Sequence, residues 1–124
     1  MNIETDYDES IRTLIVKMHG LNRLSILEGW KDQFLQTLSG YSDHEEKISL
    51  MIDTRYHEFE SYQCLVLLRQ LFTSEILQYP CIDRKVFVQP GRYRLPEVKN
   101  DYEAYFSSPE EALQWLMCFK QRFA

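Results

Sequence analysis

Arginine, histidine and tyrosine side chains follow two of the apolar runs in the sequence. Arg55 and His57 come soon after the run SLMI, and Arg92, Tyr93 and Arg94 come soon after KVFV. Guanidinium groups recognise carboxylates and phosphates through paired, charge-assisted hydrogen bonds. If the two runs are parallel strands of one sheet, their carboxyl ends meet at the edge where such sheets bind ligands. The spacing therefore predicts a contact site for an anionic ligand or a partner protein.

A purely structural role is the alternative for the same arginines. Asp53 and Glu58 are close enough in sequence to pair with Arg55. Arg92 and Arg94 can point into water, where ion pairs contribute little to stability. Both interpretations stay open, because the sequence does not show which of these side chains meet.

Histidine and acidic residues do not repeat with the spacing of a metal site. The segment HEFES, which begins at His57, matches the zinc motif H-E-x-x-H except at its last position, Ser61. His19 and His44 belong to other segments, and we expect the three histidines in three different loops. We therefore expect neither a metal nor another cofactor.

Nucleophilic chemistry at cysteine is not expected either. Cys64 falls in the first turn of an apolar helix, and Cys118 lies off the buried stripe of the last helix. Neither has a basic cluster beside it to stabilise a thiolate. The cysteines are predicted to be inert thiols, buried or half-buried, and the chain is predicted not to be an enzyme.

The bulk composition narrows the class of protein. The chain has 124 residues, 44% of them apolar, and a net charge of -5, which fits a single domain with one core. An acidic balance argues against a broad nucleic-acid footprint, and no apolar stretch reaches the ~20 residues of a membrane span. Three cysteines without paired spacing and a polar, acidic start predict a cytoplasmic protein.

Hydrophobic patterns predict alternating strands and helices. The predicted fold is an α/β single layered domain, with a mixed, mostly parallel sheet of about four to five strands and helices packed on it. Residues 1–10 are a flexible segment or an edge strand. Segment 92–101 has room for one helical turn at most. The expected elements are strand 12–18 ending at Gly20, a helix from a Ser25/Glu28 capping box to Gly40, strand 47–53, helix 62–77, strand 85–89, strand 102–106 and a helix that starts at Pro109 behind an N-cap at Ser108.

These elements, with their motifs, resemble a known family. The pattern IRTLIVKMHG, a capped helix, LMIDTR, KVFVQP and YFSSPEEALQWL is similar to bacterial STAS-like domains, which are related to the anti-sigma-factor antagonists and share the sporulation stage II AA-like fold. The resemblance covers roughly residues 11–117. It implies a non-enzymatic α/β domain that acts through protein partners or small ligands.

The antagonists carry a phosphorylated serine at the start of the helix that follows the LMID strand. In this chain Tyr62 and Gln63 occupy the two serine positions, Cys64 occupies the glycine position, and Ser61 lies one residue early. A docking kinase needs small neighbours, so a phosphoserine switch is not expected. Ser61 is predicted to be a plain N-cap whose hydroxyl accepts a hydrogen bond from an amide two or three residues on.

The last helix offers a candidate interface. Trp115 shares a face with Arg122, whereas the expected buried stripe points elsewhere; its members are Ala112, Leu116, Phe119 and Phe123. Trp115 is either half covered at the edge of the sheet or an anchor for a partner or a second copy of the chain, since Trp and Arg are enriched in interfaces. A homodimer is one possible outcome.

Together these patterns predict a non-catalytic interaction or regulatory module that lacks the phosphoserine switch. Its partner is an unidentified protein or small ligand, with no nucleic acid and no membrane span. The alternative is a carrier of a small apolar or amphipathic, lipid-like ligand, because STAS-like domains resemble lipid-carrying domains in fold and the helix at 62–77 is apolar enough to line a cavity.

Overall fold

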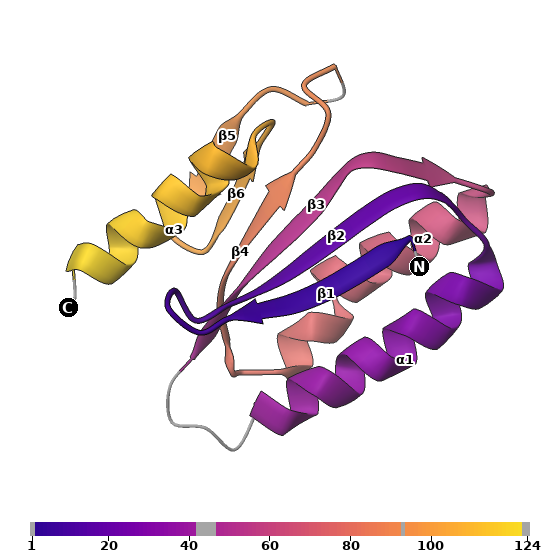
Figure 1. The fold of residues 1–124 in the computed structure, drawn as a ribbon, viewed down its shortest axis with the longest axis horizontal. Coiled ribbons are helices and arrows are strands. Elements are labelled where there is room, and N and C mark those ends of the chain that lie inside the picture. Colours follow the sequence, from indigo (N-terminus) through magenta and orange to yellow (C-terminus); the bar gives the residue numbers. More distant parts are fainter. Residues whose placement is uncertain (1, 42–46, 93, 123–124) are drawn as a thin grey trace.

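A six-stranded sheet with helices on both faces forms the protein (Figure 1). The computed structural model describes residues 2–41, 47–92 and 94–122, without the side chains of 119–122. The strand order is β1-β2-β3-β4-β6-β5. The elements are β1 (Ile3–Asp8), β2 (Thr13–Asn22), α1 (Leu24–Tyr41), β3 (Ile48–Phe59), α2 (Tyr62–Thr73), the 3-10 helix η1 (Glu75–Gln78), β4 (Ile82–Val88), β5 (Glu97–Asn100), β6 (Glu103–Phe106) and α3 (Pro109–Arg122).

The predicted fold class is confirmed. The central strands β2, β3, β4 and β6 pair in parallel, whereas β1 and β5 pair antiparallel at the two edges. Helices α1 and α2 cover one face of the sheet, and α3 covers part of the other (Figure 1). The first residues form the edge strand β1, which was one of the two alternatives for that segment.

The predicted number of strands was too low, because β5 was missed. Segment 92–101 was predicted to contain one helical turn at most, but it contains the edge strand β5. All four residues of β5 are exposed, so the alternation of apolar and polar residues that reveals a half-buried strand is absent. Its pairing with β6 depends on main-chain hydrogen bonds, which leave no mark on the sequence.

Strand β3 is longer than predicted. It continues past Asp53 to Phe59, where a polar loop was expected. Beyond Asp53 the strand leaves the core and pairs with the far end of β2, which likewise continues past the predicted stop at Gly20 to Asn22. Gly20 has φ of +68°, a conformation that glycine adopts without strain. The predicted ends were wrong because pairing, and not burial, extends both strands.

A bulge in β3 changes which side chains face the helices. Lys17 pairs with Asp53 and His19 pairs with Tyr56, so β3 contains one more residue than β2 between these pairs. Phe59, the last residue of the strand, lies five positions after Thr54, and regular alternation would place the two side chains on opposite faces of the sheet. The extra residue of the bulge brings both side chains to the face covered by α2.

Helix α1 confirms the predicted buried stripe, Leu27, Trp30, Phe34 and Leu38. It begins at Leu24, one residue before the predicted cap, and the Leu24 amide donates to the Glu60 carboxylate at 3.5 Å.

The other helices agree in part with the predictions. Helix α2 starts at Tyr62 as predicted but ends at Thr73, where η1 takes over. In α3 the predicted cap is present, since the Glu111 amide donates to the Ser108 hydroxyl at 3.2 Å. Ala112 and Leu116 are buried as predicted, whereas the side chains of Phe119 and Phe123 lie outside the described residues.

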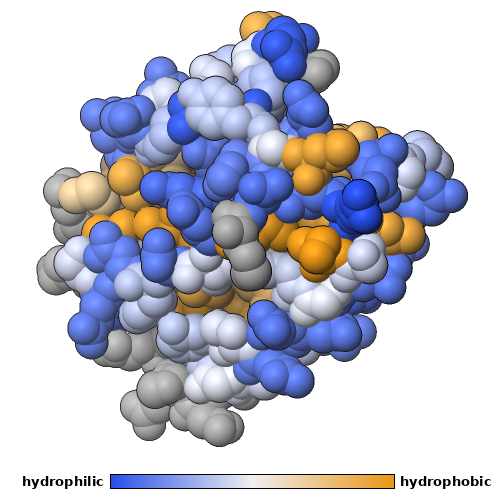
Figure 2. Space-filling model, turned by 45° about the vertical axis from the view of Figure 1, so that its right-hand side comes forward, coloured by the Kyte–Doolittle hydropathy of each residue, from blue (hydrophilic) through white to orange (hydrophobic). Residues whose placement is uncertain are grey.

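Aromatic rings connect the helices to the sheet. Trp30 stacks on Phe34 at 4.9 Å, Phe34 meets Phe72 edge-on at 6.1 Å, and Phe72 meets Phe87 edge-on at 6.2 Å. This chain of rings runs from α1 through α2 to β4. On the outside, Figure 2 shows a mostly hydrophilic face with hydrophobic residues in a band across its middle. Among the described residues, no helix combines the length and hydropathy needed to cross a membrane.

Substitutions on the buried and the exposed face of α1 are expected to change the free energy of unfolding by different amounts. Leu27 is 0% exposed and its neighbour Ile26 is 53% exposed. We expect Leu27→Ala to lower the free energy of unfolding by about 2–5 kcal/mol, because it leaves a cavity in the core. Ile26→Ala should change it by less than about 0.5 kcal/mol. Urea titration followed by circular dichroism measures both, and equal losses would contradict this placement of the helix.

Candidate ligand-binding pocket

A pocket of about 430 Å³ opens between α2 and the carboxyl ends of the parallel strands. This is the edge of the sheet at which the sequence predicted a contact site, and the volume falls in the range of small-molecule sites. We call it the strand-end pocket. Its lining residues are Ile52, Thr54, Phe59, Leu65, Leu68, Arg69, Phe72, Thr73, Phe87, Gln89, Arg94 and Tyr105.

The sheet side of the strand-end pocket is an aromatic surface. Phe87 of β4 and Tyr105 of β6 are direct neighbours in register, and their rings stack at 5.1 Å with planes 14° apart. The Arg94 guanidinium lies over the Tyr105 ring at 3.4 Å from its centre. The result is a stack of one flat cation and two flat rings. The Arg94 guanidinium keeps N–H donors that a ligand can use.

The charge of the strand-end pocket is positive. Among the described residues that line it, two are arginines and none is Asp or Glu. Arg94 donates to Glu97 at 2.8 Å, and this hydrogen bond is the main cause that raises the pKa of Arg94. Arg69 makes no ion pair or side-chain hydrogen bond within the described part of the chain. An acidic protein thus presents an uncompensated cation next to an apolar cavity.

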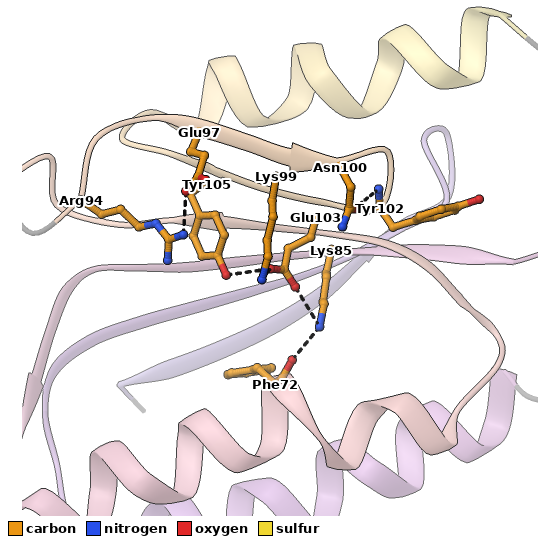
Figure 3. Close-up of polar contacts among 9 residues, drawn as sticks. All are labelled: Phe72, Lys85, Arg94, Glu97, Lys99, Asn100, Tyr102, Glu103 and Tyr105. Carbon is orange, nitrogen blue, oxygen red and sulfur yellow. Dashed lines mark hydrogen bonds and ion pairs between the residues drawn. The ribbon is translucent and has the colours of Figure 1, made fainter.

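A hydrogen-bonded network fixes the sheet side of the pocket (Figure 3). Lys85 donates to the Phe72 carbonyl at the end of α2 at 3.0 Å and pairs with Glu103 at 3.1 Å. The Tyr105 hydroxyl donates to Glu103 at 2.9 Å, and Lys99 lies 3.4 Å from the same carboxylate. Lys85 therefore ties the sheet to α2, and Glu103 holds Tyr105 in place.

Electrostatics keep Glu103 ionised. Burial acts to raise the pKa of Glu103, but the hydrogen bonds from Tyr105 and Lys85 and the charges of Lys85 and Lys99 lower it below its ordinary value. Burial raises the pKa of Tyr105, and the hydrogen bond to Glu103 adds to the rise. The phenol thus stays a neutral donor.

The predicted convergence of Arg55 with Arg94 was wrong. Arg55 makes two side-chain hydrogen bonds to buried Asp53, at 3.1 and 3.0 Å, which was the structural alternative for this residue. The charge of Glu110, in the first turn of α3, also acts on Arg55, whereas Arg94 lies over Tyr105 in the pocket beside α2. The two arginines therefore occupy opposite faces of the sheet.

His57 lies in β3 and not in a loop, and His19 likewise lies in β2. The His57 ring meets Phe59 edge-on at 4.7 Å, and neither nitrogen of this ring has a hydrogen-bond partner among the described residues. Burial lowers the pKa of His57, so the ring is neutral at pH 7. His57 supports a wall of the strand-end pocket through Phe59 but does not line it.

The remaining members of the predicted contact site are not found among the described residues that line the strand-end pocket. Arg92 is exposed and does not line the pocket. Tyr93 and His44 lie outside the described residues.

Ser61 is the N-cap of α2, as predicted, but its hydroxyl does not cap the helix. The Ser61 Oγ lies 3.4 Å from the Cys64 Sγ instead. Because the thiol occupies the place of an amide donor, the predicted capping hydrogen bond was wrong.

On α3, Trp115 is half-buried and its ring centre lies 6.5 Å from that of Phe106. The side chain of Arg122 lies outside the described residues. Cys64 and Cys81 are buried, but Cys118 is exposed, so its predicted burial was wrong. No group of three metal-ligating side chains occurs in the ranges that the structure describes.

A larger hollow of about 580 Å³ lies between the outer sides of α1 and α2. It is open to solvent and mixes Glu28 and Asp32 with Lys31, which pairs with Glu75 at 3.3 Å. The strand-end pocket is the better candidate because its charge has one sign and its walls are aromatic.

The fold, but no function, follows from comparison with known proteins. No family model and no curated protein matches the sequence. A solved structure of an uncharacterised protein from the DUF3478 family of Shewanella loihica PV-4, with a SpoIIAA-like fold, is similar over 92% of this chain and 91% of that chain, with a TM-score of 0.60 and 15% sequence identity. This chain therefore has a SpoIIAA-like fold, which confirms the fold that its STAS-like motifs predicted.

Sequence reasoning missed most residues of the strand-end pocket, including Arg69 and Tyr105. One signal was present: Arg69 is the only charged residue in α2. A lone cation in an otherwise uncharged helix is a candidate for a specific contact. Nothing in the sequence indicated that it would lie near Arg94.

The Glu103 network makes a prediction about pH. At pH 7 we expect Glu103→Gln to lower the free energy of unfolding by about 1–3 kcal/mol, because hydrogen bonds to a charged group are lost. The pKa of Glu103 is lower in the folded than in the unfolded chain, so its stabilisation is present above about pH 4.3 and is lost as the pH falls through the folded pKa. The difference between wild type and variant should shrink over that range in urea titrations. The exposed Glu58→Gln variant is the control and should show no such convergence.

Proposed function

We propose that the protein is a non-catalytic binding module whose ligand is a small amphipathic anion held in the strand-end pocket. One observation carries the proposal: an apolar pocket with two arginines and, among its described lining residues, no acidic side chain, in a chain of net charge -5. A local positive field attracts an anion, and the apolar walls favour a hydrophobic body. This proposal develops the predicted carrier of an amphipathic ligand.

The absence of catalysis is supported by the contacts of His57 and Cys64. A cysteine nucleophile needs a hydrogen bond to its base. Both ring nitrogens of His57 lack a partner in the described chain, and the Cys64 thiol meets Ser61 and the Asn22 carbonyl. The most reactive residue types of this region are therefore not assembled into a catalytic pair.

The proposal also includes the absence of a phosphoserine switch. Ser61 follows Glu60, whose carboxylate accepts from the Leu24 amide and lies 3.9 Å from Arg23. A phosphate on Ser61 would meet this negative charge and the bulky neighbour Tyr62, which disfavours both the modification and its docking enzyme.

An amphipathic anionic dye tests the proposal. We expect 8-anilinonaphthalene-1-sulfonate to bind wild-type protein with saturable fluorescence and a stoichiometry of one. Thr54→Phe should abolish the signal because the larger side chain fills the strand-end pocket. Native mass spectrometry of freshly purified protein should in addition show a co-purified ligand that Thr54→Phe lacks.

Thr37→Phe is the matched control, since Thr37 is exposed on α1, and it should bind the dye as wild type does. Thermal unfolding of both variants establishes that they are folded. Binding that is unsaturable, or unchanged in Thr54→Phe, would contradict the proposal.

A contact surface for a protein partner is the second candidate function, as the resemblance implied. Three aromatic residues at the end of β3 and the start of α2 are exposed: Tyr56 by 68%, Phe59 by 43% and Tyr62 by 70%. Aromatic residues are enriched in interface cores, and Phe59 also lines the strand-end pocket. This placement favours a partner that responds to the occupied pocket.

Serine substitutions at Tyr56 and Tyr62 test this surface. The double variant should remain folded but lose a stoichiometric partner, or a second copy of the chain, in quantitative affinity capture and sedimentation. Tyr102→Ser is the control, since Tyr102 is also exposed but lies at the opposite end of the sheet. Retention of all wild-type associations by the double variant would remove this surface as a partner site.

A further inference from the structure

We infer that the ligand of the strand-end pocket is a small planar aromatic acid, bound as its anion. This inference rests on the proposed function and narrows its ligand class.

The walls of the pocket favour a flat ring over a flexible chain. Phe87 and Tyr105 stack on each other with nearly parallel planes, and Phe59 adds a further ring to the lining. Aromatic pairs in stacked or edge-on geometry gain free energy beyond what apolar area provides. Because these two rings cover each other's faces, a flat ligand that enters between the Phe87–Tyr105 pair and α2 makes edge-on contacts on the sheet side.

Buried rings in the lining of the pocket disfavour a long chain. Ile52, Leu68, Phe72 and Phe87 line the pocket and are all buried in the core. Phe72 also packs against Phe34 and Phe87, so an extended tail would have to displace the rings that join α2 to the sheet. The available volume of about 430 Å³ suits a compact ligand.

In this inference, two guanidinium groups on opposite walls of the pocket bind the carboxylate of the ligand. Arg69 comes from α2 and has no partner in the described chain. Arg94 comes from the sheet side and is held in place by Tyr105 and Glu97. A carboxylate accepts up to four hydrogen bonds, so it can bridge an immobilised arginine and a free one. The ring of the ligand then lies between α2 and the edges of Tyr105 and Phe87.

Isothermal titration with three probes of similar size tests the inference. The probes are 2-naphthoate, its neutral analogue 2-naphthamide, and the flexible acid decanoate. Wild-type protein should bind 2-naphthoate about 3- to 10-fold more tightly than decanoate, because of the ring contacts. It should bind 2-naphthamide about 10- to 100-fold more weakly than 2-naphthoate, because the charge-assisted hydrogen bonds are lost.

Arg69→Gln should remove the preference for 2-naphthoate over 2-naphthamide without changing the melting temperature. Arg23→Gln is the matched control, because Arg23 is exposed and lies outside the strand-end pocket, and it should retain the wild-type preference. An unchanged preference in Arg69→Gln would overturn the assignment of this residue to the anion.

The outcomes separate this inference from the proposed function. Decanoate that binds as tightly as 2-naphthoate would overturn the aromatic ligand and leave an amphipathic anion in the pocket. If neither acid nor the anilinonaphthalene dye binds, both the inference and the proposed function fail.

Discussion

The fold depends on the burial of strand β3 from both sides. All six residues from Ile48 to Asp53 are buried, because α1 and α2 cover one face of the sheet and α3 covers part of the other. Such a strand must lie in the middle of the sheet, between β2 and β4, and parallel pairing suits it because both faces are covered by helices. Parallel pairing in turn brings the carboxyl ends of β3, β4 and β6 to one edge. The strand-end pocket lies at that edge.

The pocket is formed where β3 leaves the core. The bulge after Asp53 turns Thr54 and Phe59 to the same face, and α2 begins only three residues after Phe59. Lys85 joins the far end of α2 to the sheet, so both walls are held at a defined separation. Tyr105 and Arg94 are fixed by Glu103 and Glu97. A site held in this way loses little conformational entropy when it binds a ligand, which favours affinity.

The sheet also separates two sets of charges. Asp53 and Arg55 pair with each other on the face of α3, where a buried carboxylate needs a partner. Arg69 and Arg94 lie on the face of α2, beside apolar walls. A SpoIIAA-like fold specifies neither arrangement, because a fold supports many sites and the site decides the function. In this chain the proposed ligand site lies on the face of α2, where Arg69 lines an apolar pocket.

The sequence by itself determined the features that depend on local periodicity and capping. The stripe of α1, the cap of α3 at Ser108 and the doubly buried run of β3 follow from side chains a few residues apart, and they sufficed for the fold class. Local signals could not reveal β5, which buries nothing, or the extension of β3, which depends on pairing with β2. Only the tertiary structure decided that Arg69 and Arg94 line the same pocket while Arg55 faces the opposite side. The physical reason is that strand register, one bulged residue and the packing of α2 determine which distant side chains meet, and these arise from the whole chain at once.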